Sequence, residues 1–333
     1  MTPTLATASD RTNRSFVRTV RGDIGPAEVG FTHCHEHVFI LPGASCRLDG
    51  DLLLDDLDKT TAELREFFAA DGRTVVDAQP IGQERAPTLQ RLASERSGVN
   101  IVATTGFHRA IYYCPDHFRF RQPADVLAER LIREITEGMA EYDGAEEIGA
   151  TDIRAGLVKF ASDYHLIDAQ ARKAAEAVAA AHAATGAPIL THTEHGTCGL
   201  EQIELFDRLG VPPSALLLSH LDRNPDIYLH DEITQTGAYV VYDAISRAKR
   251  LPDSTIVGLI CRLVESGRAS RILLGMDMAR RSMWRSYGGG PGMTYLGNVF
   301  LRRLREAGMG VEQIRMFTEY NPAAALSFRD QPR

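Results

Sequence analysis

Short apolar segments alternate with longer amphipathic segments along most of the chain. The apolar segments are rich in Val, Ile and Leu and end at polar or glycine residues, as buried strands do. The amphipathic segments repeat apolar residues at the spacing of one helix face. We therefore expect eight strands, at residues 31–40, 74–78, 100–106, 155–160, 188–193, 215–220, 237–243 and 271–277, and helices at about 55–70, 84–97, 124–142, 169–184, 200–209, 226–235, 254–265, 295–307 and 311–320.

The regular alternation of strand and helix predicts an α/β fold with a parallel sheet. Strands that are apolar on both faces are typical of parallel sheets covered by helices. No Gly-x-Gly-x-x-Gly turn follows the first strand, so the βα units favour a (β/α)8 TIM barrel over a dinucleotide-binding fold. Segments 16–20 and 27–29 predict a short N-terminal β-hairpin. No low-complexity linker interrupts the chain, so we expect one domain over residues 1–333, with the polar residues 1–14 flexible.

The composition is that of an ordinary globular protein and argues against several kinds of partner. Hydrophobic residues make up 44% of the 333 residues, and the formal net charge of -7, with no basic half, argues against nucleic acid. No run reaches the length of a membrane span, and no signal peptide is visible. The five cysteines lack a Cys-x-x-Cys spacing, which indicates reduced thiols. We expect a cytoplasmic protein that acts on a small molecule and binds neither nucleic acid nor membrane.

The most unusual stretch is Phe31-Thr32-His33-Cys34-His35-Glu36-His37, in which a histidine recurs at every second residue. Alternate side chains of an extended strand share one face, so His33, His35 and His37 are expected to point the same way. Neutral imidazoles are common ligands of transition metals. The spacing of His33, Glu36 and His37 also matches a metalloprotease pattern that requires a helix, but the flanking Val and Phe residues favour a strand. A structural histidine cluster is the plain alternative.

Further polar residues fall at the C-terminal ends of other predicted strands. Lys159 lies in the fourth strand, His192 in the fifth, His220 in the sixth and Asp277 in the eighth. Each has a structural alternative, since a histidine can be a core residue, an aspartate can cap a helix and a lysine can lie at the surface. Because the C-terminal ends of barrel strands converge on the active-site face, the set as a whole predicts a metal-dependent site.

These residues occur in a recognisable order. The chain resembles the phosphotriesterase-like family of the amidohydrolase superfamily over roughly residues 25–328, through the motifs Gly30-Phe31-Thr32-His33-Cys34-His35-Glu36-His37, Gly156-Leu157-Val158-Lys159, Thr191-His192-Thr193, Ser219-His220 and Gly275-Met276-Asp277. The resemblance implies a centre of two divalent metal ions. It assigns His35, His37 and Asp277 to the more buried ion and His192 and His220 to the exposed ion. Lys159, carboxylated on Nζ by carbon dioxide, would bridge them. His33 would then lie beside the site, and the role of Cys34 stays open.

The resemblance also implies a mechanism. Two divalent ions lower the pKa of a shared water, and the bridging hydroxide attacks a carbonyl or phosphoryl group that the exposed ion polarises. Asp277 accepts the proton and passes it to the leaving group. Zinc suits these nitrogen and oxygen ligands, and manganese or cobalt should substitute. Homodimers are common in the family, so a homodimer is one expected assembly.

The loops after the last two strands indicate the substrate. They hold five cations, Arg247, Lys249, Arg250, Arg280 and Arg281, where TIM barrels often bind phosphate. Residues 276–282, followed by residues 287–292, also look like the branch of the family that hydrolyses phosphorylated sugar lactones, and Tyr112 and Tyr113 are candidates to line the pocket. We expect a lactonase for a phosphorylated or otherwise anionic sugar lactone. The alternatives are a phosphotriesterase, an N-acyl amide hydrolase and a non-catalytic metal-binding barrel. The alternative interpretation of the five cations is that they form a solvated surface.

Overall fold

The computed structural model describes residues 15–143 and 147–329, and the predicted flexible segment 1–14 lies outside the described residues. The strands are β1 (Val17–Thr19), β2 (Gly22–Ile24), β3 (Phe31–Glu36), β4 (Gly72–Asp77), β5 (Asn100–Val102), β6 (Thr104–Gly106), β7 (Ala140–Asp143), β8 (Glu147–Ala150), β9 (Leu157–Ala161), β10 (Ile189–His192), β11 (Leu216–Ser219), β12 (Tyr239–Tyr242) and β13 (Ile272–Leu274). The α-helices are α1 (Ala44–Leu48), α2 (Leu57–Ala69), α3 (Pro87–Ser97), α4 (Phe118–Arg121), α5 (Ala124–Thr136), α6 (Ala169–Thr185), α7 (Gly199–Arg208), α8 (Ile227–Gln235), α9 (Asp253–Glu265), α10 (Leu301–Glu306), α11 (Val311–Arg315) and α12 (Asn321–Leu326).

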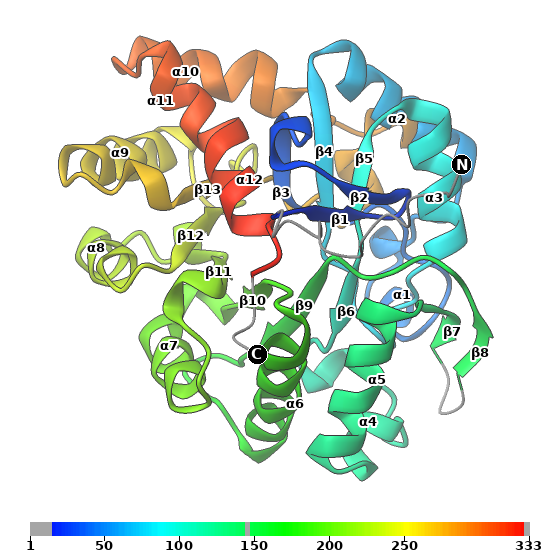
Figure 1. The fold of residues 1–333 in the computed structure, drawn as a ribbon. Coiled ribbons are helices and arrows are strands. Elements are labelled where there is room, and N and C mark those ends of the chain that lie inside the picture. The colour runs from blue at the N-terminus through cyan, green and yellow to red at the C-terminus, as the bar shows by residue number, and fades with distance from the viewer. Residues whose placement is uncertain (1–14, 144–146, 330–333) are drawn as a thin grey trace, which may run out of the picture.

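Two parallel sheets join into a closed barrel (Figure 1). Strands β6, β9, β10, β11, β12 and β13 form one sheet, and β3, β4 and β5 form the other. The run 100–106 links them because β5 pairs with β4 whereas β6, beyond Ala103, pairs with β9. At the other junction, the backbone N–H of Asp277 donates to the carbonyl of His35 (2.9 Å). Gly275 lies so close to His35 there that a Cβ would approach the His35 nitrogen to 2.9 Å. The predicted TIM barrel is confirmed.

One apolar side chain from each of the eight barrel strands fills the inside of the barrel. We call this set the inner layer; its fully buried members are Cys34, Val76, Val102, Leu157, Leu190, Leu217, Val241 and Leu273. Val17 of β1 and Leu326 of α12 belong to the same cluster, so the hairpin and this helix close the N-terminal end of the barrel (Figure 1). Because side chains alternate along a strand, Lys159 follows Leu157 on the same face. The inner layer therefore supports the polar residues next to it.

The helices pack their apolar faces on the outside of the barrel. These faces form a second apolar cluster, larger than the inner layer, which includes Leu64 and Phe67 of α2, Ile135 of α5 and Phe206 of α7. Aspartate side chains accept backbone N–H groups in the first turns of α2, α6 and α8, which satisfies donors that a helix leaves free. Among the described residues, no helix has the length and apolar character that crossing a membrane requires.

Two local predictions were wrong. The hairpin partner of β1 is β2 rather than residues 27–29, because Pro26 begins a short 3-10 turn there. The helix predicted over 124–142 ends at Thr136, and a hairpin of β7 and β8 follows it. Gly138 explains the stop: a Cβ on this residue would collide with the carbonyl of Thr151, so the chain turns sharply into the hairpin. The last predicted helices also begin or continue as π-helical turns, at Leu296–Phe300 and Met316–Tyr320.

Candidate metal centre

Six predicted ligands meet at the C-terminal end of the barrel. His35 lies in β3 and Lys159 in β9, whereas His192 ends β10. The other three lie beyond strand ends: His37 directly follows β3, His220 directly follows β11, and Asp277 lies three residues after the end of β13. All six are buried, with at most 7% of each residue exposed.

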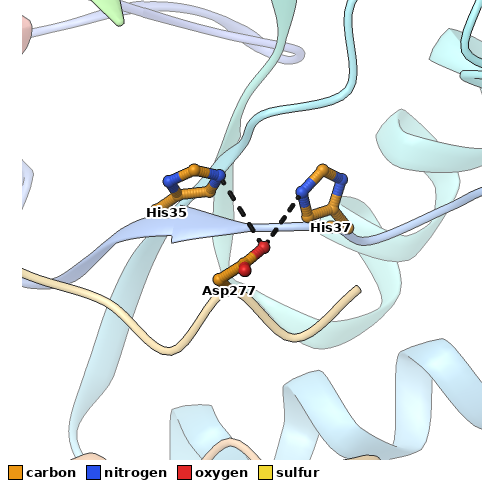
Figure 2. A group of neighbouring side chains, drawn as sticks. All are labelled: His35, His37 and Asp277. Atoms are coloured by element: carbon orange, nitrogen blue, oxygen red, sulfur yellow. Dashed lines mark ion pairs between the residues drawn. The ribbon is translucent and has the colours of Figure 1, made fainter. Parts of the chain in front are cut away.

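Asp277 forms the first half of the site. Its Oδ1 lies 3.4 Å from Nε2 of His37 and 3.9 Å from Nε2 of His35, and Figure 2 shows both imidazoles directed toward this carboxylate. The Nζ of Lys159 lies 3.5 Å from Nε2 of His35. The ligand atoms of His35, His37 and Asp277 are close enough to hold one metal ion.

His192 and His220 form the second half. Their ring centroids are 4.5 Å apart, and the ring of His220 lies 4.8 Å from that of His35. The Nε2 of His192 contacts a carboxylate oxygen of Glu194 at 2.7 Å, whereas its buried Nδ1 has no hydrogen-bond partner among the described residues. A buried nitrogen without a partner is costly unless something else binds it. The donor set therefore fits a second ion.

The protonation states at the site suit metal binding. Burial, reinforced by nearby cations, lowers the pKa values of His192 and His220 well below the usual value, so both imidazoles are neutral. Burial also lowers the pKa of Lys159 to about 8. Burial alone would raise the pKa of Asp277, but Arg247 and the contact with His37 hold it well below its usual range. Neutral imidazoles and an ionised carboxylate are the forms that bind metals.

The backbone is strained at two of these ligands. Asp277 has a φ of 47° and His220 a φ of 69°, in the left-handed region that non-glycine residues rarely adopt. Such conformations cost free energy and persist where the surrounding structure enforces them, which is common at functional sites.

His33 does not share the face of His35 and His37, so this prediction was wrong. The pairing of β3 with β4 shifts register between His33 and Glu36, which breaks the simple alternation. His33 packs on Phe67 of α2, and its Nδ1 lies 2.8 Å from Oε1 of Glu36. The carboxylate of Glu36 accepts the backbone N–H groups of the two residues on either side of Asp277, at 2.9 Å each. His33 thus acts on the site indirectly, through Glu36, and Cys34 belongs to the inner layer.

Three residues behind the histidines were not predicted. Asp243, directly after β12, contacts both His35 and His220. Gln79 presents its carbonyl oxygen to Nδ1 of His37 (2.5 Å), and Glu194 contacts His192. Asp243 ends a predicted strand, as His220 and Asp277 do, so the same signal could have found it. Gln79 and Glu194 lie in loops, where no sequence pattern marks them.

The site opens into a cavity of about 110 Å³. Among the predicted substrate residues, Arg247, Arg250, Arg280 and Tyr112 line this cavity, and Arg223 joins them. Arg223 and Arg247 each contact Oδ2 of Asp277, at 2.7 and 2.9 Å, and Arg280 pairs with Asp49.

The structure does not bring Lys249, Arg281 and Tyr113 into the cavity lining. Lys249 is exposed on the loop after β12. The guanidinium of Arg281 lies over the ring of Tyr287, 5.3 Å from its centroid. The hydroxyl of Tyr113 donates to the carbonyl of Ile81 (2.9 Å), which directs it into the protein interior.

A parallel barrel with histidines, a lysine and an aspartate at the C-terminal ends of its strands defines a TIM-barrel hydrolase of the amidohydrolase type. Residues 15–326 match the model of the Phosphotriesterase family, so the chain belongs to this family and is a hydrolase, as predicted. The chain is 32% identical over 327 residues to a phospho-furanose lactonase of Mycoplasmopsis synoviae, covering 95% of this chain and 93% of the relative.

Solved structures agree with this assignment. A lactonase from Listeria monocytogenes superposes with a TM-score of 0.89 at 33% identity, covering 95% of this chain and all of the other. The phosphotriesterase homology protein of Escherichia coli, with phosphate in its active site, superposes with a TM-score of 0.82 at 28% identity, covering 90% and 99% of the two chains. The predicted resemblance is therefore confirmed.

Proposed function

We propose that this hydrolase opens the ring of a phosphorylated furanose lactone. The observation that carries the proposal is the convergence of Arg223, Arg247, Arg250 and Arg280 on the cavity that holds the metal ligands. A neutral substrate gives no reason to gather four guanidinium groups around one reaction centre, since like charges repel. The names of the lactonase relatives and the phosphate bound in the Escherichia coli neighbour support the same substrate class.

The cations exceed the carboxylates available to them. Arg223 and Arg247 share Asp277, and Arg280 pairs with Asp49. In the described part of the chain, no carboxylate forms an ion pair with Arg250. Arg250 is exposed, and partial desolvation together with repulsion from Arg223 and Arg247 lowers the pKa of its guanidinium. A phosphate dianion would relieve this repulsion, because guanidinium groups bind phosphate through paired hydrogen bonds.

The residues of the chain divide the chemistry between them. His35, His37 and Asp277 would hold the buried ion, and His192 and His220 the exposed one; zinc fits these ligands and manganese or cobalt should substitute. When bound, the ions would activate water for attack on the lactone carbonyl. Asp277, kept ionised by Arg223 and Arg247, accepts the proton of the attacking water and returns it to the ring oxygen as the C–O bond breaks. Water and lactone thus give one hydroxy acid.

Lys159 is proposed to bridge the two ions as a carbamate. A fully buried ammonium is costly, and a pKa of about 8 makes the amine nucleophilic near neutral pH. Addition of the neutral amine to carbon dioxide forms one N–C bond and releases one proton. The carbamate would be an anion whose oxygens could bind metal, so a metal ligand would replace the unfavourable buried cation.

The test compares kcat/KM for a pentose γ-lactone with and without a 5-phosphate. We expect a preference of about a hundredfold for the phosphorylated lactone, roughly 2.7 kcal/mol of transition-state binding. Arg250→Ala should remove most of this preference while leaving turnover of the plain lactone nearly unchanged. Lys249→Ala is the matched control, because Lys249 lies on the same loop but outside the cavity lining.

Three outcomes would contradict the proposal. Turnover of aryl phosphotriesters without turnover of either lactone would favour a phosphotriesterase. Hydrolysis of N-acyl amides alone would favour an amidohydrolase proper. Equal losses in Arg250→Ala and Lys249→Ala would mean that the cations form a solvated surface.

A further inference from the structure

Asp243 is the only described carboxylate that contacts a predicted ligand from each half of the metal centre. It follows β12 and is completely buried. Its Oδ1 lies 2.7 Å from Nδ1 of His220, and its Oδ2 lies 2.9 Å from Nδ1 of His35. The backbone N–H of His220 also donates to Oδ2, at 3.2 Å. The contact with His35 is short but is not aligned as a hydrogen bond.

Asp243 lies behind the histidines and away from the cavity. The cavity lining includes His35 and His220 but not Asp243. Its carboxylate could in principle join these two histidines around one ion. Both of its oxygens, however, face Nδ1 atoms, and an imidazole that donates from Nδ1 presents the lone pair of Nε2 on the opposite side. The geometry therefore points to a supporting residue rather than a ligand.

The other two histidines have separate supports. Gln79 contacts His37, which belongs to the buried ion, and Glu194 contacts His192, which belongs to the exposed ion. Among the described residues, neither side chain contacts a predicted ligand of the other ion. Outer-shell partners of this kind fix the tautomer and direction of a metal-binding histidine, and removing one typically weakens metal binding 10–100-fold.

We propose that Asp243 is a positioning residue shared by both metal sites, so that the two ions depend on one carboxylate. This inference rests on the proposed binuclear centre. An asparagine at this position has the same shape but only one acceptor oxygen. The histidine that faces the amide NH2 would have to accept at Nδ1 and carry its proton on Nε2, which removes the lone pair needed for the metal. The other histidine would keep its partner but lose the assistance of a negative charge.

The experiment measures Cd²⁺ binding to the full-length apoprotein by titration, with cadmium NMR to separate the two sites. Wild-type protein should bind two equivalents. Asp243→Asn should weaken both equivalents by at least about tenfold and shift both resonances. Glu194→Gln should weaken only the exposed ion, and Gln79→Ala only the buried one, so these variants are matched controls.

The outcomes separate this inference from the proposed function. If wild-type protein binds fewer than two equivalents, the binuclear centre itself is wrong. If wild-type protein binds two and Asp243→Asn weakens only one or neither, the shared role is overturned. Circular dichroism and the Tm of the apoprotein check the fold of the variant. If Asp243→Asn does not fold, Asp243→Ser, which leaves room for water beside both Nδ1 atoms, should show the same double loss, and a single loss would overturn the inference.

Discussion

The two ends of the barrel are built from the same strands but differ in chemistry. Toward the N-terminal end, the inner layer is wholly apolar and is closed by β1, β2 and α12. Toward the C-terminal end, the same strands present histidine, lysine and aspartate. On β9 the change takes two residues, from Leu157 to Lys159, and on β10 it takes two, from Leu190 to His192.

The comparison shows how the barrel separates stability from chemistry. The apolar end contributes the burial of apolar side chains, whereas the polar end carries buried charges and strained backbone at His220 and Asp277. The polar end is therefore stabilised by the layer beneath it. Substitutions at the two ends should have opposite signatures in turnover and in the free energy of unfolding.

The largest effect is expected at the polar end. Asp277→Asn should lower kcat by about 10²–10⁴-fold, because proton transfer by a positioned carboxylate contributes this much. Turnover is measured at saturating metal, with metal content determined on the same sample. Full metal with lost turnover is the expected result, and unchanged turnover would exclude the proton-transfer role of Asp277.

The apolar end should respond in stability instead. Leu190→Ala is expected to lower the free energy of unfolding by about 2–5 kcal/mol, because it opens a cavity in a packed core. The kcat of the folded, metal-loaded fraction should change by less than about tenfold. Denaturant unfolding and steady-state kinetics measure the two quantities, and a loss of kcat as large as that of Asp277→Asn would break the separation.

Lys159 at the polar end should make the free energy of unfolding of the apoprotein depend on pH. Its folded pKa of about 8 lies below the ordinary 10.5, so the unfolded chain holds this proton over a pH range in which the folded apoprotein has lost it. Its burial thus costs stability in full below pH 8, and the cost fades as pH rises from about 8 to 10.5. Lys159→Met should make the apoprotein more stable at pH 7, by roughly 3 kcal/mol, with the difference vanishing by high pH. The measurement is denaturant unfolding of the wild-type and Lys159→Met apoproteins across this pH range. A stability difference that does not change with pH would contradict the lowered pKa of Lys159.

The smallest effect is expected where the hairpin closes the barrel. Val17→Ala should cost about 1–2 kcal/mol of unfolding free energy from lost apolar burial and leave kcat unchanged. A change in kcat would show that the hairpin end is coupled to the metal centre.

Local pattern was sufficient to predict the barrel because its strands are short, apolar and regularly spaced. The candidate ligands could be predicted because four of the six end or follow a strand, at positions where core packing does not favour polar residues. His33 was misplaced because a register shift in β3 depends on its pairing with β4, which the sequence of β3 alone does not contain.

Contacts between distant loops could not be predicted. Arg223 reaches Asp277, and Glu194 reaches His192, through side-chain directions that no periodicity encodes. For the same reason, the sequence could not show which cations line the cavity. Arg250 and Arg281 lie in loops expected equally near the site, but of these two only Arg250 lines the cavity. The end of α5 was missed because Gly138 acts through its close approach to Thr151.

The contact between β13 and β3, which closes the barrel, determines when the metal site can form during folding. His35 and His37 are made early in synthesis, but Asp277 joins them only after the last barrel strand has docked on the first. A chain still missing that strand holds no complete ligand set for the buried ion, and joining ends so far apart in sequence carries a loop-closure cost. We therefore expect the buried ion to bind only after the barrel has closed. A bound ion would then stabilise the contact between β13 and β3.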